Sequence, residues 1–414
     1  MTRSMKRTGK TSAKFVSVAA LALVLAACSS KSAAPGAPTT ASSSSGSSSS
    51  GSNGAPSSMS SASRSGSAGA SPAPSSAGAT DYSKVPPPGP SLGDTSALRG
   101  KTVYWIPITS VAPVFTVEQI NATQAFAAMG MKLQLCDGQA TPEVVARCVG
   151  QAVAAKAAGI ITTSLPPEFA RQAFDGANRA GIPMLFVNTK DATMPAEWGK
   201  KAAALPNNWN AQGALNNDLI VSDSGGKAKV LMVGVTDSSA TVAFFKEGMK
   251  GDLTKKCPGC TINDVQTSST QISNLTSLVS SALVQHPDTQ YVDVQYDSFA
   301  APVIQAIRQQ NKQSSIKLLT HLGQLDGLNR VAQGQQFADT GYSIAALGWN
   351  EADALMRLML GQDPLIDKHV TPIKTFTKEN VKGLDLTEAG WESGKWESSD
   401  DFRAMYKKLW PATS

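Results

Sequence analysis

Two series of short apolar runs, separated by amphipathic stretches of helical length, extend from about residue 100 to residue 323. Apolar runs that alternate with helical patterns are typical of parallel strands joined by crossover helices, with both faces of the sheet covered. The first series predicts strands at 101–109, 131–136, 159–163 and 182–188, with helices at 117–130, from 142 onward and at 167–180.

The same pattern starts again at residue 228. It predicts strands at 228–235, 260–266, 289–295 and 315–323, with helices at 239–250, 271–286 and 299–310. Right-handed crossovers would make each series a doubly wound sheet, so the expected fold is α/β with two Rossmann-like lobes. Ligands of such sheets bind beyond the carboxyl ends of the strands, and two facing lobes would enclose a cleft there.

Residues 1–28 have the features of a lipoprotein signal peptide. Five basic residues precede an apolar run, Phe15–Ala27, that is too short to span a bilayer. The run ends in Leu25-Ala26-Ala27-Cys28, which resembles the lipobox of bacterial lipoproteins, where the cysteine receives a diacylglyceryl group and becomes the mature N-terminus. Ordinary signal-peptidase cleavage, with Cys28 unmodified, is the alternative. We expect an exported protein, lipid-anchored to the outer face of the cell membrane on its periplasmic or cell-surface side.

Residues 29–95 are expected to form a disordered tether. Ser, Gly, Ala and Pro dominate this stretch, and Arg64 is the only charged residue between Ala33 and Thr80. Such a composition buries too little apolar surface to offset the entropy of ordering. The signal peptide contributes five basic and no acidic residues to a net charge of +6, which leaves +1 for the mature chain. This balance argues against a nucleic-acid partner.

Several segments follow one another in the order and spacing of a known family. They are LCDGQATPE (135–143), AAGIITTSLPPE (157–168), ANRAGIPMLFVNT (177–189), LVQHPDTQYVDVQYDSFAAPVIQAIRQQN (283–311) and GWNEADALMRLMLGQDP (348–364). Together they resemble the type I periplasmic binding proteins of ABC importers, in the ribose- and galactose-binding branch. The resemblance covers about residues 100–383 and implies two lobes, joined by a three-strand hinge, that close over one small ligand.

The resemblance also divides the chain. Lobe 1 is expected at 96–205 and about 343–363, lobe 2 at 206–342 and about 364–385, and a tail at 386–414. The tail is expected to form a short helix from about Ser399 that packs onto a lobe, because Phe402, Met405, Tyr406 and Leu409 recur at helical spacing. The implied partners are a small-molecule ligand, an ABC permease and, through the N-terminal lipid, the membrane. We expect a monomer without cofactor or metal.

Family positions for ligand contacts are only partly kept. Sugar binders usually carry an Asp-Arg pair after the fourth strand, where this chain has Asn188-Thr189, and they carry an Arg in the segment that corresponds to 237–248, where this chain has none. The predicted ligand-binding residues are Phe115, in the loop after the first strand, and Ser164, Asn188, Lys190, Asp237, Phe245, Tyr296, Asp297, Gln324 and Tyr342.

Each of these positions also has a structural interpretation. Phe115 and Phe245 suit an apolar core, turn geometry alone favours Asn188, and Asp297 suits the N-cap of the helix near Phe299. Trp105 is interpreted as sheet packing. Because the set has few charges and several aromatic rings, a sugar, a cyclitol, a nucleoside and a partly apolar small molecule all remain open. A role in presenting a ligand to a receptor or sensor kinase is the alternative to import.

The sequence does not favour an enzyme. Its three histidines, His286, His321 and His369, lie far apart, and it contains no serine elbow, no Gly-X-Gly-X-X-Gly motif and no His-X-X-X-His motif.

Setting Cys28 aside leaves four cysteines, for which disulfides are the default outside the cytosol. Cys136 ends a predicted strand and Cys148 lies in the following helix, so a helix that packs on its own strand would bring them together. We expect Cys257 and Cys260 to pair across Pro258-Gly259. A redox or metal role for this second pair is disfavoured, because the pair follows the end of a helix and has no His or other Cys nearby.

Overall fold

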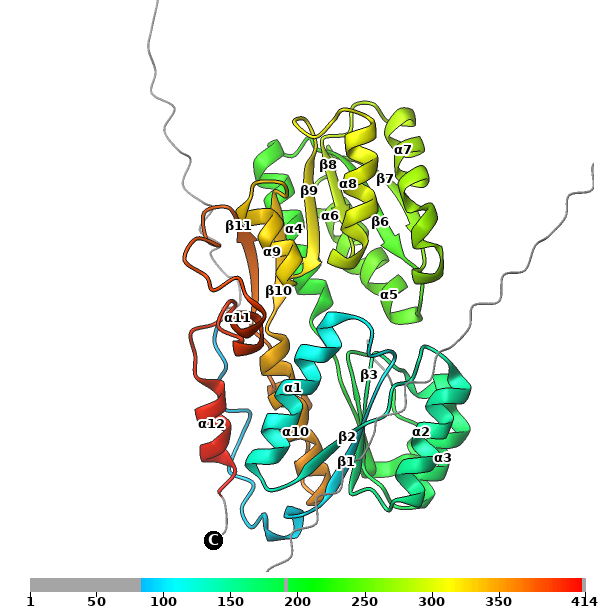
Figure 1. Ribbon diagram of the computed structural model, residues 1–414, viewed down its shortest axis with the longest axis vertical. Helices are drawn as coiled ribbons and strands as arrows, with labels where there is room; N and C mark the ends of the chain where they lie inside the picture. Colours follow the sequence, from blue (N-terminus) through cyan, green and yellow to red (C-terminus); the bar gives the residue numbers. More distant parts are fainter. Residues whose placement is uncertain (1–82, 190–192, 412–414) are drawn as a thin grey trace, which may run out of the picture. The chain divides into compact units, whose positions relative to one another are not determined.

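A computed structural model describes residues 83–189 and 193–411, and its strands form two sheets, each at the centre of one lobe (Figure 1). In lobe 1 the strands are all parallel and lie in the order β2 (Lys132–Leu135), β1 (Thr102–Pro107), β3 (Gly159–Thr163), β4 (Met184–Val187) and β5 (Ala202–Leu205). The predicted α/β class with two doubly wound lobes is confirmed.

Helices cover both faces of the lobe 1 sheet. Successive strand residues enter two cores: Ile161 and Leu185 join one, while Ile160 and Met184 join the other. This explains why β3 and β4 are apolar without alternation and fully buried. The helices are α1 (Pro113–Ala128), α2 (Pro142–Ala154), α3 (Arg171–Arg179) and α10 (Ile344–Met359), with short 3-10 helices at Ser96–Leu98, Pro167–Ala170 and Ala196–Lys201.

Lobe 2 contains a sheet of six strands. Its order is β11 (Ile373–Thr377), β10 (Ala338–Tyr342), β9 (Lys317–Leu322), β8 (Tyr291–Val294), β6 (Lys229–Val235) and β7 (Thr261–Thr267). β11 pairs antiparallel with β10, and the other pairs are parallel. Its helices are α4 (Trp209–Ser224), α5 (Ser239–Ala243), a π-helix at Phe244–Gly251, α6 (Asp252–Lys256), α7 (Leu275–Gln285), α8 (Ala300–Gln309) and α9 (Leu325–Ala332), with 3-10 helices at Ser269–Asn274 and Asp297–Phe299.

The chain passes between the two sheets three times. It leaves lobe 1 after β5 and returns after β10, where α10 packs along α1. It then re-enters lobe 2 through a 3-10 helix at Ile366–Lys368 and β11. A Cβ at Gly348 of α10 would lie 2.7 Å from the backbone nitrogen of Ala122 in α1, so a glycine is needed for this close approach.

Both described ends of the chain lie against α10. The tail contains α11 (Glu388–Ser393) and α12 (Phe402–Leu409), and α12 begins at Phe402 rather than at about Ser399 because Asp401 caps it. Phe402 and Tyr406 are buried against Trp349 of α10. The segment that precedes β1 runs beside this tail, where the amide of Leu92 donates to the carbonyl of Leu409 at 2.9 Å.

The sequence pattern missed β5, α4, α9 and β11. The buried face of α4 carries Gln212, Asn216 and Asn217, so this helix has no apolar periodicity to detect. The pattern also placed Phe115 in a loop. This prediction is wrong, because Pro113 starts α1 early and puts the half-buried Phe115 in its first turn.

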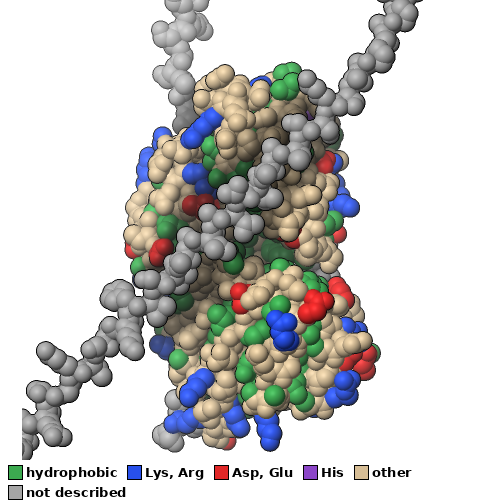
Figure 2. Space-filling view, turned by 45° about the vertical axis from the view of Figure 1, so that its right-hand side comes forward, with side chains coloured by type: hydrophobic (Ala, Val, Ile, Leu, Met, Phe, Trp, Pro, Cys, Tyr) green, Lys and Arg blue, Asp and Glu red, His purple; other side chains and the backbone are tan. Residues whose placement is uncertain are grey.

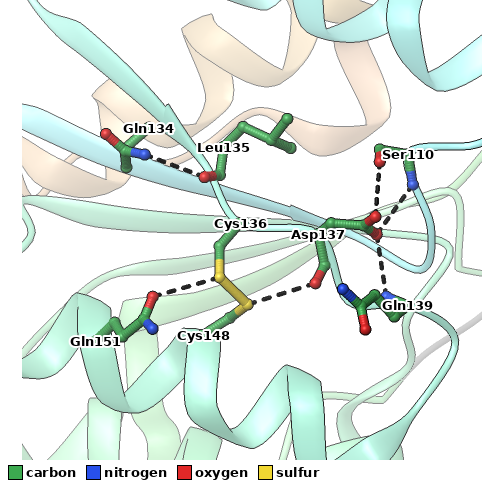
Figure 3. The surroundings of a disulfide bond; sticks show 8 residues. All are labelled: Ser110, Gln134, Leu135, Cys136, Asp137, Gln139, Cys148 and Gln151. Atoms are coloured by element: carbon green, nitrogen blue, oxygen red, sulfur yellow. Dashed lines mark hydrogen bonds between the residues drawn. A yellow bond between two sulfur atoms is a disulfide. The ribbon is translucent and has the colours of Figure 1, made fainter. Parts of the chain in front are cut away.

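Both predicted disulfides are present. Cys136 follows β2 and pairs with Cys148 of α2, next to Asp137, which accepts hydrogen bonds from the amide and hydroxyl of Ser110 (Figure 3). Cys257 follows α6 and pairs with Cys260, which precedes β7. The second disulfide therefore lies at the amino ends of the lobe 2 strands, away from the edge where ligands bind to such sheets.

We expect the two disulfides to contribute unequally to stability. Cys136–Cys148 closes a loop with a sequence separation of 12 and Cys257–Cys260 one of 3. The chain-entropy model gives about 3 kcal/mol for the longer loop and about 2 kcal/mol for the shorter one. Urea unfolding should show a larger loss for the Cys136→Ser/Cys148→Ser variant than for Cys257→Ser/Cys260→Ser. Equal losses, or a larger loss for Cys257→Ser/Cys260→Ser, would contradict the expected order.

Candidate functional site

Two strands of lobe 1 end in residues with left-handed backbone geometry. Ser164 follows β3 with φ 59°, and Asn188 follows β4 with φ 55°. Asn188 is 3% exposed, and its side-chain amide donates to the Thr163 hydroxyl at 3.0 Å. Its side-chain oxygen has no hydrogen-bond partner among the described residues. The carboxyl edge of this sheet therefore presents a buried acceptor that a ligand hydroxyl can fill.

Two glutamates are completely buried beside this edge. Glu118 of α1 and Glu351 of α10 are both 0% exposed, and the indole Nε1 of Trp105 donates to Glu351 Oε1 at 3.1 Å. The Thr163 hydroxyl and the Glu351 carboxyl lie beside Glu118, although neither is aligned for a hydrogen bond to it. Burial raises the pKa of Glu118 to about 8, and burial followed by the charge of Glu118 raises the pKa of Glu351. The pair therefore holds a proton at neutral pH.

Tyr342 joins this cluster to the connections between the lobes. It ends β10, is 3% exposed, and lies beside Asn207 at the entry to α4, without a hydrogen bond to the Asn207 amide nitrogen. Burial, and then the nearness of Glu118 and of Tyr296 in lobe 2, raise the pKa of Tyr342. Asn207 Nδ2 and Gln212 Oε1, which lie next to each other, have no partner in the described structure. Polar groups from both lobes thus converge at Tyr342.

Tyr296 is half-buried where β8 ends. Its ring lies 6.2 Å from that of Phe244, and its hydroxyl accepts a hydrogen bond from Gln295 Nε2 at 3.2 Å. Phe245 instead packs against Gly234 of β6, so closely that a Cβ added at Gly234 would lie 2.8 Å from its ring. Phe245 is 3% exposed and therefore lies in the apolar core, as the structural interpretation of this residue expected.

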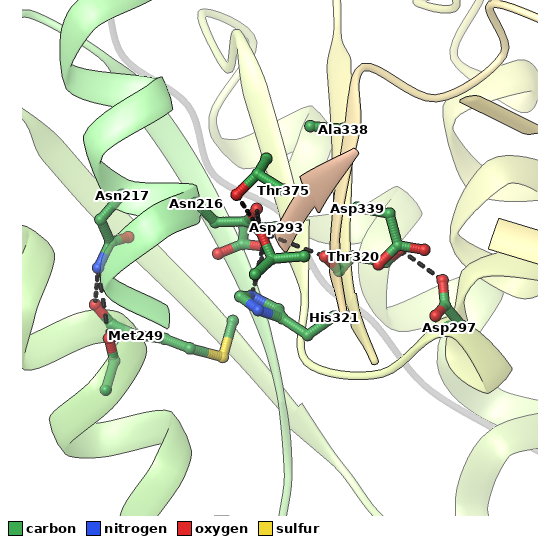
Figure 4. Close-up of polar contacts among 12 residues, drawn as sticks. Asn216, Asn217, Met249, Asp293, Asp297, Thr320, His321, Ala338, Asp339 and Thr375 are labelled. Atoms are coloured by element: carbon green, nitrogen blue, oxygen red, sulfur yellow. Dashed lines mark hydrogen bonds and ion pairs between the residues drawn. The ribbon is translucent and has the colours of Figure 1, made fainter. Parts of the chain in front are cut away.

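Asp297 does not cap the helix that follows it, so that alternative is wrong. Its carboxylate turns toward α9, accepting from the backbone amide of Gln324 at 3.0 Å and from Arg330 Nη2 at 3.2 Å. Asp339 of β10 lies beside it (Figure 4), and burial followed by their mutual repulsion raises the pKa of Asp339. Asp297 and Gln324 thus lie together in lobe 2, and both are buried.

The remaining predicted positions differ in accessibility. Asp237 is exposed and accepts a hydrogen bond from the amide of Ser269 at 2.8 Å, which fixes the loop after β7. Lys190 lies outside the described residues.

A second buried network lies inside lobe 2. Asn216 of α4 donates to the carbonyl of Thr320 at 3.0 Å and accepts from the Thr340 hydroxyl at 2.6 Å (Figure 4). His321 Nε2 lies 3.1 Å from Asp293 Oδ1, and neither side chain is exposed. These contacts attach α4 to the sheet, so this network stabilises lobe 2.

Residues 103–363 match the family described as the periplasmic binding protein domain. This chain belongs to that family. Its members are solute-binding proteins rather than enzymes, and membership implies an exported, extracytoplasmic protein. The resemblance noted from the sequence is thereby confirmed.

Solved structures of other periplasmic binding proteins share the fold. A glucose-galactose binding protein from Geobacillus stearothermophilus is 17% identical, with 69% of this chain and 99% of that chain covered and a TM-score of 0.60. A solute binding protein from Actinobacillus succinogenes, solved with D-allose, is 16% identical, with 68% and 99% covered and a TM-score of 0.61. A 5-methylthioribose binding protein from Thermotoga lettingae is 14% identical, with 75% and 94% covered and a TM-score of 0.60. Curated protein sequences contain no match.

Sequence reasoning missed Glu118, Glu351, Asn207 and Gln212 in this binding protein. The glutamates did leave a signal, since Glu118 lies four residues from both Val114 and Ala122, and Glu351 lies four from both Leu347 and Leu355. A carboxylate on the apolar face of a helix indicates a buried acid. Asn207 and Gln212 left no such signal, because polar residues are ordinary in a loop and at a helix start.

Neither a cluster of metal ligands nor a helix that could span a membrane is found among the described residues. Within residues 83–189 and 193–411, no three His, Cys, Asp or Glu side chains form a cluster suited to a metal ion. The same part of the chain contains no helix long and apolar enough to cross a membrane.

The glutamate pair makes stability depend on pH. The pKa of Glu118 is about 8 in the folded chain and 4.5 for an ordinary carboxyl. The contribution of protonated Glu118 to stability is therefore complete below about pH 4.5 and is lost as pH rises through 8. The free energy of unfolding should fall over this window by a few kcal/mol, since one pKa unit corresponds to about 1.4 kcal/mol. Glu118→Gln should flatten the decline in chemical unfolding.

The exposed Glu143 on the same lobe is the matched control. Glu143→Gln should keep the wild-type decline. A Glu118→Gln protein with an unchanged slope would contradict the buried, protonated pair.

Proposed function

We propose that this periplasmic binding protein captures a small polyhydroxylated ligand, a sugar or sugar-like molecule, and delivers it to an ABC permease. The ligand binds where the carboxyl edges of the two sheets meet at Tyr342. The observation that carries this proposal is the set of unpartnered buried polar atoms around Tyr342, in a chain whose family binds solutes.

The chemistry of these atoms favours a ligand rich in hydroxyl groups. In the cluster that includes Tyr342 and the two glutamates, the oxygens without a partner among the described residues are Asn188 Oδ1, Gln212 Oε1, Glu351 Oε2 and both carboxyl oxygens of Glu118, and the unpartnered amide nitrogen is Asn207 Nδ2. Because the glutamate pair holds a proton, one of its oxygens can also donate. A hydroxyl can donate to such an oxygen and accept from such an amide. An unpaired buried polar group costs about 1–3 kcal/mol, so a polyol that pairs several of them gains affinity.

The aromatic side chains favour a ligand with an apolar part. Tyr296 is half-buried beside Phe244 and Phe299, and its ring offers an apolar face at the carboxyl edge of lobe 2. One of the similar structures binds 5-methylthioribose, a sugar with a methylthio group. A sugar-like ligand with an apolar substituent fits this combination of polar and aromatic groups better than a plain hexose.

Delivery depends on closure of the lobes. The three connections between the sheets would act as a hinge, and the ligand stabilises the closed form by contacting both lobes. The closed form then docks on the permease.

A thermal-shift screen of pentoses, hexoses, cyclitols, nucleosides and 5-methylthioribose tests the proposal. A ligand at 100 times its dissociation constant should stabilise the protein by about 2.7 kcal/mol. Asn188→Ala should weaken binding of that ligand about 10-fold or more in calorimetry, because it removes a buried acceptor.

Asn311→Ala is the matched control. Asn311 also has a positive φ, of 54°, but it lies at the turn before β9, at the opposite edge of lobe 2. This variant should lose stability without losing affinity. The ligand should also make the protein more compact in small-angle scattering. If no polyhydroxylated compound stabilises the protein, the proposal is wrong.

We also propose that Cys28 anchors the protein to the membrane. The support is the Leu25-Ala26-Ala27-Cys28 sequence behind a basic and apolar signal. In a bacterial host, Cys28→Ser should move the protein from the membrane fraction to the soluble exported fraction, and intact-mass measurement should show the loss of a diacylglyceryl adduct. An unmodified Cys28 in the mature wild-type protein would instead indicate ordinary signal-peptidase cleavage.

A further inference from the structure

A basic residue begins each strand of the lobe 1 sheet or lies within five residues before its start. The five strands are parallel, so their amino ends lie at one edge, opposite the candidate ligand site. Figure 2 shows Lys and Arg side chains along the lower rim of this lobe. The basic residues that precede or begin the five strands are Lys101, Lys132, Lys156, Arg179, Lys200 and Lys201, and all six are exposed.

Most of these positive charges have no acidic neighbour among the described residues; Arg179 is the exception, because its charge lowers the pKa of Asp175 in the same helix. The segments that lead into the strands, 97–102, 129–132, 155–159, 180–184 and 198–202, contain no Asp or Glu. The ammonium groups of Lys101, Lys156 and Lys201 form no hydrogen bond or ion pair with any residue that the structure describes. An acidic surface could therefore contact them without displacing an internal partner.

The corresponding edge of lobe 2 behaves differently. Lysines also lie near the starts of its strands, but acidic residues of α4 pair with two of them. Lys256 lies 2.6 Å from Asp218, and Lys317 pairs with Asp223 at 2.5 Å. Helix dipoles favour a lysine at the carboxyl end of a helix in either lobe. They do not explain why the lysines around the lobe 1 edge lack acidic partners while Lys256 and Lys317 of lobe 2 have them.

A depression lies within the basic edge. Its volume is about 670 Å³, and it is lined by Leu98, Val153, Ile182 and Met359, with Lys101 and Lys156. Lys201 reaches the same place, since its Nζ lies 3.4 Å from the position of a Cβ on Gly181, which also lines the depression. The edge thus offers an apolar hollow flanked by three ammonium groups, a combination that suits an amphipathic anion.

We propose that this basic edge of lobe 1, defined by Lys101, Lys132, Lys156, Arg179, Lys200 and Lys201, docks on a membrane surface that contains anionic lipid. Anionic headgroups attract clustered Lys and Arg side chains. The apolar hollow accommodates the glycerol and upper acyl region of a lipid between Lys101, Lys156 and Lys201.

The segment between Cys28 and Ser83 is long enough for the basic edge to contact the membrane often. Between Cys28 and Ser83 lie 54 residues of mainly Ser, Gly, Ala and Pro. The tether that this composition predicts would span about 40 Å root-mean-square, comparable to the size of one domain. A tether of this kind raises the effective concentration of the edge at the membrane. Docking through this edge directs the opposite, carboxyl edge of lobe 1 away from the bilayer, where it samples free solute.

Vesicle binding tests the surface without the lipid anchor. The chain from position 28 onward, with Cys28→Ser, is mixed with vesicles of phosphatidylcholine alone or with 30 per cent phosphatidylglycerol. Binding should require phosphatidylglycerol and weaken as salt rises. Lys101→Gln/Lys156→Gln/Lys201→Gln should reduce the affinity about 10-fold or more. Lys227→Gln/Lys255→Gln/Lys312→Gln, with the same charge change at the distal edge of lobe 2, should bind as wild type.

Each other outcome overturns the proposal. Equal loss in the two triple variants would show a net-charge effect. Binding to phosphatidylcholine alone would show apolar insertion rather than charge recognition. Binding to polyglutamate but not to the anionic vesicles would assign the edge to an acidic polymer. Circular dichroism and ligand-induced thermal shifts confirm that both variants are folded and keep the ligand site.

Discussion

The packing of α10 against α1 is the contact on which both lobes and both described chain ends depend. All residues of α10 from Ile344 to Leu358 are buried, which is unusual for a helix with Asn, Glu, Asp and Arg in its sequence. Most of these polar groups have a specific partner. Asp353 accepts from Arg357 at 2.7 Å and from the Trp410 indole at 2.6 Å, and the Tyr406 hydroxyl donates to Asn350 at 2.6 Å. The C-terminal tail therefore completes the core of lobe 1.

The glutamate pair is the exception within this interface. No Lys, Arg or His of the described residues shifts the pKa of Glu118 or Glu351, and the buried pair is stabilised by holding a proton. The pair lies next to Tyr342, which also contacts the α4 entry and therefore touches two of the three connections between the lobes. The charge of Glu118 therefore acts on a side chain that lies at the connections between the lobes.

Periodicity predicted most of the fold because the strands that it found are buried on both faces. Residues 159–163 and 182–188 are apolar without interruption, which only a covered parallel sheet requires. It failed where the buried face is polar. α4 packs Gln212, Asn216 and Asn217 inward, and the partners of the two asparagines, Asp252, Thr320 and Thr340, come from distant parts of the chain. Apolar patterns carry no information about such long-range pairs.

The site was partly predictable for the same reason. Asn188 and Tyr342 follow from strand ends, because a parallel sheet fixes which residues reach its carboxyl edge. Asp297 follows the same rule, yet its carboxylate turns to α9, where the backbone amide of Gln324 at the N-cap and the guanidinium of Arg330 in the last turn donate to it. The direction of the strands determines which residues lie at the carboxyl edge of the sheet. Competition among neighbouring hydrogen-bond donors then determines which of these residues remain free to contact a ligand. In lobe 1 that competition leaves acceptors unpaired at one edge and ammonium groups unpaired at the other, so the two ends of one sheet are chemically suited to different partners.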